Sequence, residues 1–228
     1  MNDSGVVATG GLRVLGSAYL RRRYAVLFYT LLLTMVAVPL VAAFELRASL
    51  IDYFLGANLL AAVVPAGGGR GRVILLATMT VLWLARSATA WFEHPALVAM
   101  TLGFWTVIAL IAAAAALRFA MGAISVDAEH LYAALSAYLL AGVFFGHFYW
   151  VLQQIRPDTF AVTGDFSRMS AIYFSFVTLA TLGYGDIVPR SDVARGLAIV
   201  EGVGGQLFLA VMVARLVSLY GRGKADNS

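Results

Sequence analysis

Six long apolar runs dominate this sequence and limit the structures that it can adopt. They cover residues 24–44, 50–64, 73–91, 95–117, 131–152 and 192–215. A helix needs about 20 apolar residues to cross the hydrocarbon core of a bilayer, and five of these runs reach that length. The second run is shorter and is expected to borrow residues 45–49. The sequence therefore predicts an all-α integral membrane protein with six transmembrane helices.

The composition agrees with a membrane environment. Hydrophobic residues make up 61% of the chain, charged residues only 12%, and the mean hydropathy is +0.86. A soluble domain needs more charge to cover its surface. Cysteine is absent, which excludes disulfides and thiolate metal sites. The net charge of +4 comes from basic residues at the ends of the apolar runs, and this distribution indicates membrane topology rather than nucleic-acid binding.

The basic residues also predict the orientation of the chain. With the N-terminus inside, ten arginine or lysine residues fall in cytoplasmic segments and five in external ones, as the positive-inside tendency requires. The first run follows a basic triplet and lacks an early cleavage site, so we expect a retained span rather than a signal peptide. This predicts a multi-pass protein of the plasma (inner) membrane with both termini in the cytoplasm.

A seventh apolar segment, residues 166–180, is too short to cross the membrane. At 1.5 Å per residue a helix of this length reaches about 20 Å. Since the runs on either side already account for the topology, we expect the segment to enter from outside and return. Irregular backbone at membrane depth must be buried in protein or line a water-filled cavity. Thr181–Asp186, which follows, is therefore predicted to lie beside water inside the membrane.

Thr181–Asp186 reads TLGYGD, and its two glycines suggest what the segment does. Successive carbonyls point to one side of a strand only if residues alternate between right- and left-handed conformations. Positive φ is costly for residues other than glycine. Gly183 and Gly185, spaced by two, permit the alternation. Such a row of carbonyls can replace the water shell of a bare cation, with the hydroxyl of Thr181 at the inner mouth.

The TLGYGD segment resembles the signature sequence of potassium channels, in which TVGYGD is commonest. The resemblance covers roughly residues 131–219 and implies that K⁺ is the permeating ion and that no cofactor is needed. It implies a selectivity filter formed by Thr181, Leu182, Gly183, Tyr184 and Gly185, with K⁺ held by the backbone carbonyls of the first four.

One filter strand offers ligands from one side only, so four copies must surround one pore as a homotetramer. Six spans with the pore in the last two resemble the bacterial six-transmembrane, voltage-gated-like architecture, in which the first four spans form an S1–S4-like four-helix domain. We expect a cytoplasmic segment at 1–23, this four-helix domain at 24–121, the pore domain at 122–220 and a cytoplasmic tail at 221–228.

The same resemblance assigns supporting roles around the filter. Thr178 matches a threonine of the pore helix. Tyr173 and Phe174 stand where the family usually has a tryptophan pair. Asp186 is therefore expected to reach Tyr173 behind the filter, whereas Phe174 has no donor to offer to Tyr184.

Polar and small residues in the apolar runs are further candidates. Gly205 matches the hinge glycine of the inner helix, although close helix packing is the alternative. Glu201 could tune the filter or titrate, or it could be neutral and hydrogen-bonded behind the pore helix. Gln206 is a candidate cavity residue. His147 is either a proton sensor or a satisfied packing residue.

Asp52 and Arg86 fall at similar depth near the outer ends of the second and third runs. A lone charge at such depth costs several kcal/mol, so the two are predicted to pair.

The fourth run, residues 95–117, contains no arginine or lysine, and Arg118 stands alone at its inner end. Voltage sensing requires several embedded charges, so S4-arginine sensing is not expected. A leak-like conductance, filter gating, and control by lipid, protons or a partner all remain open.

The alternative function is a membrane sensory or interaction module that keeps the pore fold without conducting. The sequence has no HExxH or GxSxG motif and no paired catalytic aspartates, so an enzyme is not expected. The expected partners are other copies of the chain and membrane lipids, without nucleic acid or a small-molecule substrate.

Overall fold

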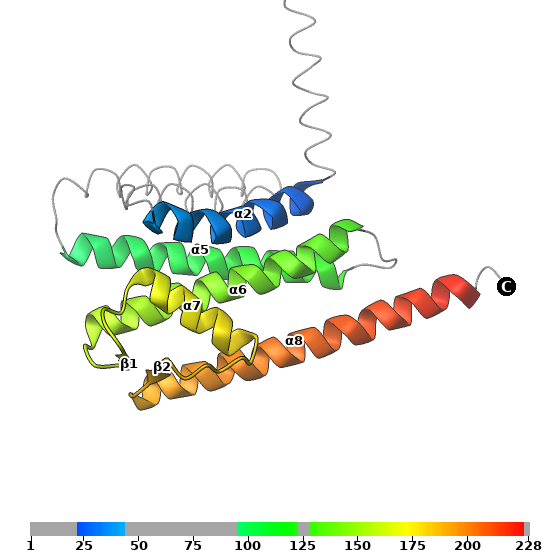
Figure 1. Ribbon diagram of the computed structural model, residues 1–228. Coiled ribbons are helices and arrows are strands. Elements are labelled where there is room, and N and C mark those ends of the chain that lie inside the picture. Colours follow the sequence, from blue (N-terminus) through cyan, green and yellow to red (C-terminus); the bar gives the residue numbers. More distant parts are fainter. Residues whose placement is uncertain (1–21, 44–94, 123–127, 226–228) are drawn as a thin grey trace, which may run out of the picture.

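The computed structural model describes residues 22–43, 95–122 and 128–225, which form five helices and two short strands. In chain order these elements are α2 (Arg23–Ala43), α5 (Pro95–Met121), α6 (Ala128–Ile155), β1 (Phe160–Val162), α7 (Arg168–Leu179), β2 (Ile187–Pro189) and α8 (Asp192–Ala225) (Figure 1). Their bounds agree within a few residues with the predicted first, fourth and fifth runs and with the predicted half-span. Helix α8 starts where predicted and continues to Ala225, past the predicted end of the pore domain at residue 220.

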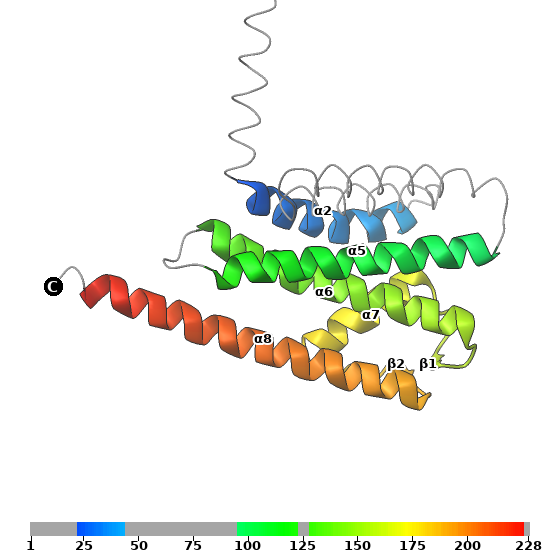
Figure 2. The same cartoon turned by 180° about the vertical axis from the view of Figure 1, so that it is seen from behind.

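Helices α2, α5 and α6 pack side by side, and α7 lies between α6 and α8 (Figures 1 and 2). The core between the first three is rich in alanine, a residue small enough to let helix backbones approach closely. Its buried members are Tyr24, Leu27, Leu31, Ile108, Ala112, Ala113, Ala116, Ala120, Ala133, Ala134, Ala137 and Leu140. Helices α2 and α5 therefore rest directly on α6 of the same chain.

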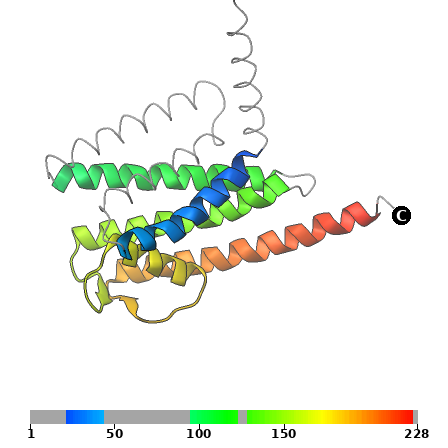
Figure 3. The same cartoon turned by 45° about the horizontal axis from the view of Figure 1, so that its top comes forward.

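A second core joins α6, β1, α7, β2 and α8 at one end of the molecule (Figure 3). Tyr149 of α6 is its centre, with ring centroids 5.4 Å from Phe160 and 5.1 Å from Phe174, both in edge-on arrangements. Edge-on aromatic pairs contribute about 0.5–1.5 kcal/mol beyond the area that they bury. This cluster holds α7 and the segments that flank it in one packed unit.

The structure is helical, as predicted, and one short ribbon of two strands accompanies the helices. Strands β1 and β2 pair antiparallel, with Phe160 opposite Pro189 and Val162 opposite Ile187. Backbone groups that leave helical structure need other partners, and valine, isoleucine and phenylalanine suit a pleated, half-buried ribbon. The ribbon ties the loop after α6 to the residues that follow Thr181–Asp186.

Within the described residues, two segments are long and apolar enough to cross a membrane: Ala128–Ile155 and Asp192–Arg215. Shorter apolar stretches occupy Arg23–Ala37 and Leu110–Met121. The second and third predicted spans, and with them Asp52 and Arg86, lie outside the described residues. The count of six spans and the Asp52–Arg86 pair stay predictions.

Candidate functional site

Helix α7 is the short apolar helix that the sequence predicted to enter and return. Ser167 caps its N-terminus by accepting a hydrogen bond at its hydroxyl from the backbone N–H of Ser170, at 3.1 Å. A side-chain oxygen in this position satisfies one of the unpaired donors of the first turn. At 12 residues the helix cannot span a bilayer.

Three glycines let α7 pack closely against its neighbours. A Cβ added at Gly142 of α6 would lie 2.5 Å from the ring of Phe176, and one at Gly146 would lie 2.7 Å from the Cα of Ile172. On the other side, a Cβ at Gly205 of α8 would lie 2.7 Å from a backbone carbonyl of α7. Any larger side chain at these positions would push α7 away from α6 or α8.

The chain leaves α7 through a tight turn and becomes extended. The N–H of Thr181 donates to the carbonyl of Thr178 at 3.0 Å, and that of Leu182 donates to the carbonyl of Val177 at 2.9 Å. From this point Thr181, Gly183 and Gly185 have φ values of 57°, 58° and 78°. Leu182, between the first two, is not among the positive-φ residues of the described chain.

Positive φ therefore recurs at every second residue from 181 to 185, which is the alternation that the sequence predicted for Gly183 and Gly185. The positive φ of Thr181 was not predicted. A left-handed conformation costs a residue with a Cβ roughly 1–2 kcal/mol. The spacing could have predicted the positive φ of Thr181, since this residue stands two positions before Gly183 and so continues the alternation.

The side chains of Thr181–Asp186 are exposed in the single chain, including large ones: Leu182 is 57% and Tyr184 66% accessible. Behind the segment, the hydroxyl of Tyr173 hydrogen-bonds Asp186. This bond is the main reason why the pKa of Tyr173 lies above its ordinary value. The rings of Tyr173 and Tyr184 stack with centroids 6.5 Å apart. Asp186 and Tyr173 are therefore in contact, and their supporting role stays a prediction. Phe174 points instead into the aromatic cluster around Tyr149.

At the start of the segment, helix α8 supplies a polar contact. The side-chain amide of Gln206 lies 3.4 Å from the hydroxyl of Thr181 and donates to it. The neighbouring Gly205 is buried against α7, and α8 runs through it without interruption. The hinge at Gly205 stays a prediction, and the contact that the structure gives this glycine is close packing.

Glu201 is buried behind α7, with 1% of its surface accessible. The hydroxyl of Tyr149 donates to its Oε2 at 2.7 Å, and the hydroxyl of Ser175 is hydrogen-bonded to its Oε1. These partners are separated from Glu201 by 52 and 26 residues. The sequence offered no periodicity or motif that could have identified them.

His147, also buried, donates from Nδ1 to the carbonyl of Val143 one turn earlier, at 2.8 Å. This bond satisfies one ring nitrogen within α6 itself. The role of His147 as a proton sensor stays a prediction.

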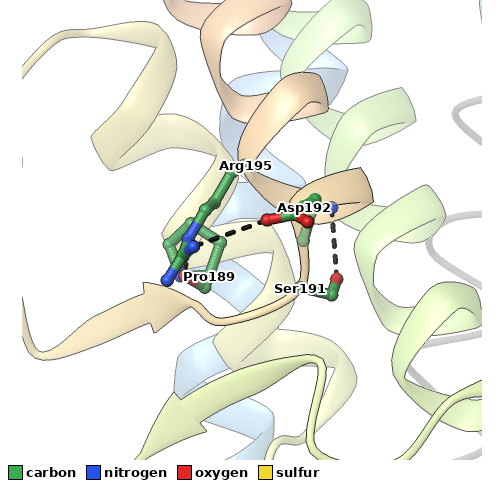
Figure 4. A network of polar contacts seen from close by, with 5 residues as sticks. Pro189, Ser191, Asp192 and Arg195 are labelled. Atoms are coloured by element: carbon green, nitrogen blue, oxygen red, sulfur yellow. Dashed lines mark hydrogen bonds and ion pairs between the residues drawn. The ribbon is translucent and has the colours of Figure 1, made fainter.

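After the segment, β2 leads into α8 through a capped turn (Figure 4). The hydroxyl of Ser191 accepts a hydrogen bond from the N–H of Ala194 at 3.3 Å. The guanidinium of Arg195 donates to the carbonyl of Pro189 at 3.3 Å and lies 3.5 Å from the carboxylate of Asp192. These contacts therefore hold the end of β2 against the first turn of α8.

Residues 133–222 match a protein-family model described as an ion channel. This stretch runs from α6 to α8 and contains the whole site, but it is less than half of the 228 residues. The helical structure therefore includes an ion-channel domain whose elements are α6, β1, α7, β2 and α8.

Curated relatives match the chain over shorter stretches. Two-pore potassium channel 4 of Arabidopsis thaliana is 43% identical over 61 residues, which are 27% of this chain and 22% of that protein. Two-pore potassium channel 3 of the same plant is 32% identical over 87 residues, 38% of this chain and 18% of that protein. Two pore potassium channel b of Oryza sativa subsp. japonica is 42% identical over 64 residues, which are 28% of this chain and 16% of that protein. The chain thus covers a fifth or less of most of these relatives' length, and no solved structure matches it.

Proposed function

We propose that this protein is a subunit of a potassium-selective channel through which K⁺ moves passively. The observation that carries the proposal is the alternation of backbone conformation at Thr181, Gly183 and Gly185, directly after a helix too short to span a membrane. A backbone of this kind turns successive carbonyl oxygens toward one side. Carbonyl rings replace the hydration shell of a potassium ion without introducing fixed charge.

The ligands in this proposal are the backbone carbonyls of Thr181, Leu182, Gly183 and Tyr184, and K⁺ is the transported ion. Helix α7 ends directly before these residues. The C-terminus of a helix carries roughly half a negative elementary charge, which favours a cation near Thr181.

The pore is proposed to form between four copies of the chain, because one strand supplies ligands from one side only. Two observations support further copies around the filter. The large side chains of Leu182 and Tyr184 are exposed in the single chain. Helix α8 is also exposed at many apolar positions: Val193, Ile199, Val200, Val203, Leu207, Leu209, Val211, Val213 and Val217.

The comparisons support the potassium assignment. The relatives are named as potassium channels, and the ion-channel match includes all of Thr181–Asp186. The ion-channel match and the apolar helices support a membrane protein, and we propose the plasma membrane, with both termini in the cytoplasm, as its location.

The proposed channel does not use the arginine-based voltage sensor of six-span channels. Helix α5, the fourth predicted span, carries no basic residue other than Arg118, which lies in its last turn. A charge that crosses the full potential contributes about 2.3 kcal/mol per 100 mV, so one terminal arginine cannot drive steep gating.

The test is ion flux from purified protein in liposomes that hold a potassium gradient, repeated with sodium in place of potassium. We expect potassium flux and little sodium flux. Gly183→Ala, at φ 58°, should abolish flux while the tetramer stays intact. Gly164→Ala is the matched control, because Gly164 also has positive φ, at 91°, with open space around it and a position outside the filter.

Protein that assembles as a tetramer but passes no ion would support the non-conducting module instead. Equal loss of flux in the Gly183→Ala and Gly164→Ala variants would attribute the loss to backbone strain in general, and would contradict the proposed filter.

A further inference from the structure

Glu201 is held by hydroxyl groups from two other helices. It comes from α8, Tyr149 from α6 and Ser175 from α7, and both Glu201 and Ser175 are almost completely buried. The hydroxyl of Ser175 has a second neighbour, the carbonyl oxygen of Gly142 on α6, at 2.7 Å. One buried side chain thus links the three helices of the ion-channel domain.

The protons available to this cluster fix the state of the carboxyl. A carbonyl oxygen only accepts, so the 2.7 Å contact between Ser175 and Gly142 uses the single proton of the serine hydroxyl. The bond between Ser175 and Oε1 of Glu201 then needs a proton from the glutamate itself. Tyr149 supplies its own proton to Oε2. All three hydrogen bonds form together only when Glu201 is a carboxylic acid.

The surroundings of Glu201 agree with a neutral side chain. The ionisable groups that face it are two tyrosines of α6, Tyr149 by hydrogen bond and Tyr138 by electrostatic interaction. Helix α7 contributes the uncharged hydroxyl of Ser175. Along the described ranges, no lysine, arginine or histidine is paired with this carboxyl, and a buried carboxylate without a cation is strongly disfavoured.

We propose that Glu201 is a protonated positioning residue that fixes α7, and with it the filter, against α6 and α8. This role rests on the proposed function. Ser175 lies on α7 about one turn before its last residue, Leu179, and the turn from α7 into the filter is anchored on Val177. A shift of Ser175 is therefore transmitted to the carbonyls of the filter.

The protonation state can be measured without any ion flux. Infrared difference spectra of wild type against Glu201→Gln, in lipid at neutral pH, should show the carbonyl band of a carboxylic acid in the wild type alone. Carboxylate bands in its place would overturn the proposal.

The positioning role is tested by the ratio of potassium to sodium permeability. In Glu201→Gln the new amide donates to Ser175 and its oxygen accepts from Tyr149, so selectivity should stay within about twofold of wild type, since no hydrogen bond is lost. Glu201→Ala leaves the hydroxyl of Tyr149 without an acceptor and removes the link between Ser175 and α8, so it should reduce selectivity about tenfold or more. An equal loss in both variants, or no loss in an assembled Glu201→Ala tetramer, would overturn the role.

If Glu201→Ala does not assemble, Ser175→Ala provides the test. It should lower selectivity, whereas Ser136→Ala should not. Ser136 is as completely buried as Ser175, but its hydroxyl has no hydrogen-bond partner within the described chain. Equal effects of the two serine variants would contradict the positioning role. Wild-type protein without potassium flux would overturn the proposed function and the filter positioning together, while the infrared result decides the protonation state separately.

Discussion

Gly205 of α8 faces the carbonyl oxygen of Leu179, the last residue of α7, so closely that a Cβ on the glycine would lie 2.7 Å from that oxygen. Real Cβ atoms do not approach an oxygen to this distance. The end of α7 and helix α8 therefore pack backbone to backbone, next to Thr181–Asp186.

Gly205→Ala should force α8 away from α7 and lower the dissociation temperature of the detergent-solubilised tetramer. Overpacking of this kind costs about 1–3 kcal/mol. Gly204→Ala is the matched control, because nothing lies within 4 Å of its position and alanine favours a helix by about 0.5–1 kcal/mol. If flexibility rather than packing were the function of this stretch, both variants would alter gating and neither would lower the stability of the tetramer.

The hydroxyl of Tyr138 should stabilise the C-terminal end of α7, because it donates to the carbonyl of Leu179 at 3.1 Å. Tyr138→Phe should reduce the stability of the assembled protein by about 0.5–1.5 kcal/mol, measured by thermal denaturation. Tyr29→Phe serves as the control, since that hydroxyl forms an exposed hydrogen bond with the hydroxyl of Tyr132. A larger loss in Tyr29→Phe than in Tyr138→Phe would contradict this assignment.

The hydroxyl and the β-branch of Thr181 should have separable effects. Thr181→Ser keeps the hydroxyl that accepts from Gln206 and should retain potassium selectivity. Thr181→Val keeps the shape and the backbone strain but removes the hydroxyl, so potassium flux in liposomes should fall. Equal flux in the two variants would show that the hydroxyl contributes nothing at the inner mouth.

Tyr173 and Asp186 should act as a pair behind the filter. Tyr173→Phe and Asp186→Asn are each expected to disturb selectivity, and the double variant should be no worse than the stronger single one. The hydrogen bond to Asp186 raises the pKa of Tyr173 in the folded protein. The stability that this hydrogen bond contributes is therefore present at neutral pH and is lost as the pH rises through the raised pKa of Tyr173. Alkaline loss of tetramer stability should therefore be smaller in Asp186→Asn. Additive effects of the two single changes would contradict the pairing.

The conductance should depend only weakly on membrane potential. Helix α5 has one basic residue, Arg118, at its end, and Arg118→Gln should leave the conductance–voltage relation unchanged. Recordings from planar bilayers check this directly. Steep activation that carries several gating charges per subunit would contradict it.

The sequence determined those features that depend on local chemistry. Runs of apolar residues predicted the positions of α2, α5, α6 and α8, because spanning length is a property of a single helix. The spacing of Gly183 and Gly185 predicted the alternating backbone, because tolerance of positive φ belongs to the residue itself. The short helix before them was predicted from its length alone.

Tertiary structure decided what depends on residues far apart in the chain. Three contacts join segments that no periodicity of the sequence connects. They are the hydrogen bonds of Glu201, the packing of α7 against Gly142 and Gly146, and the pairing of β1 with β2. Thr181 takes a left-handed conformation that a β-branched residue disfavours by itself, with the turn of α7 before it and Gly183 after it. Such choices are made by packing, because the free energy of many distant contacts outweighs the preference of one residue.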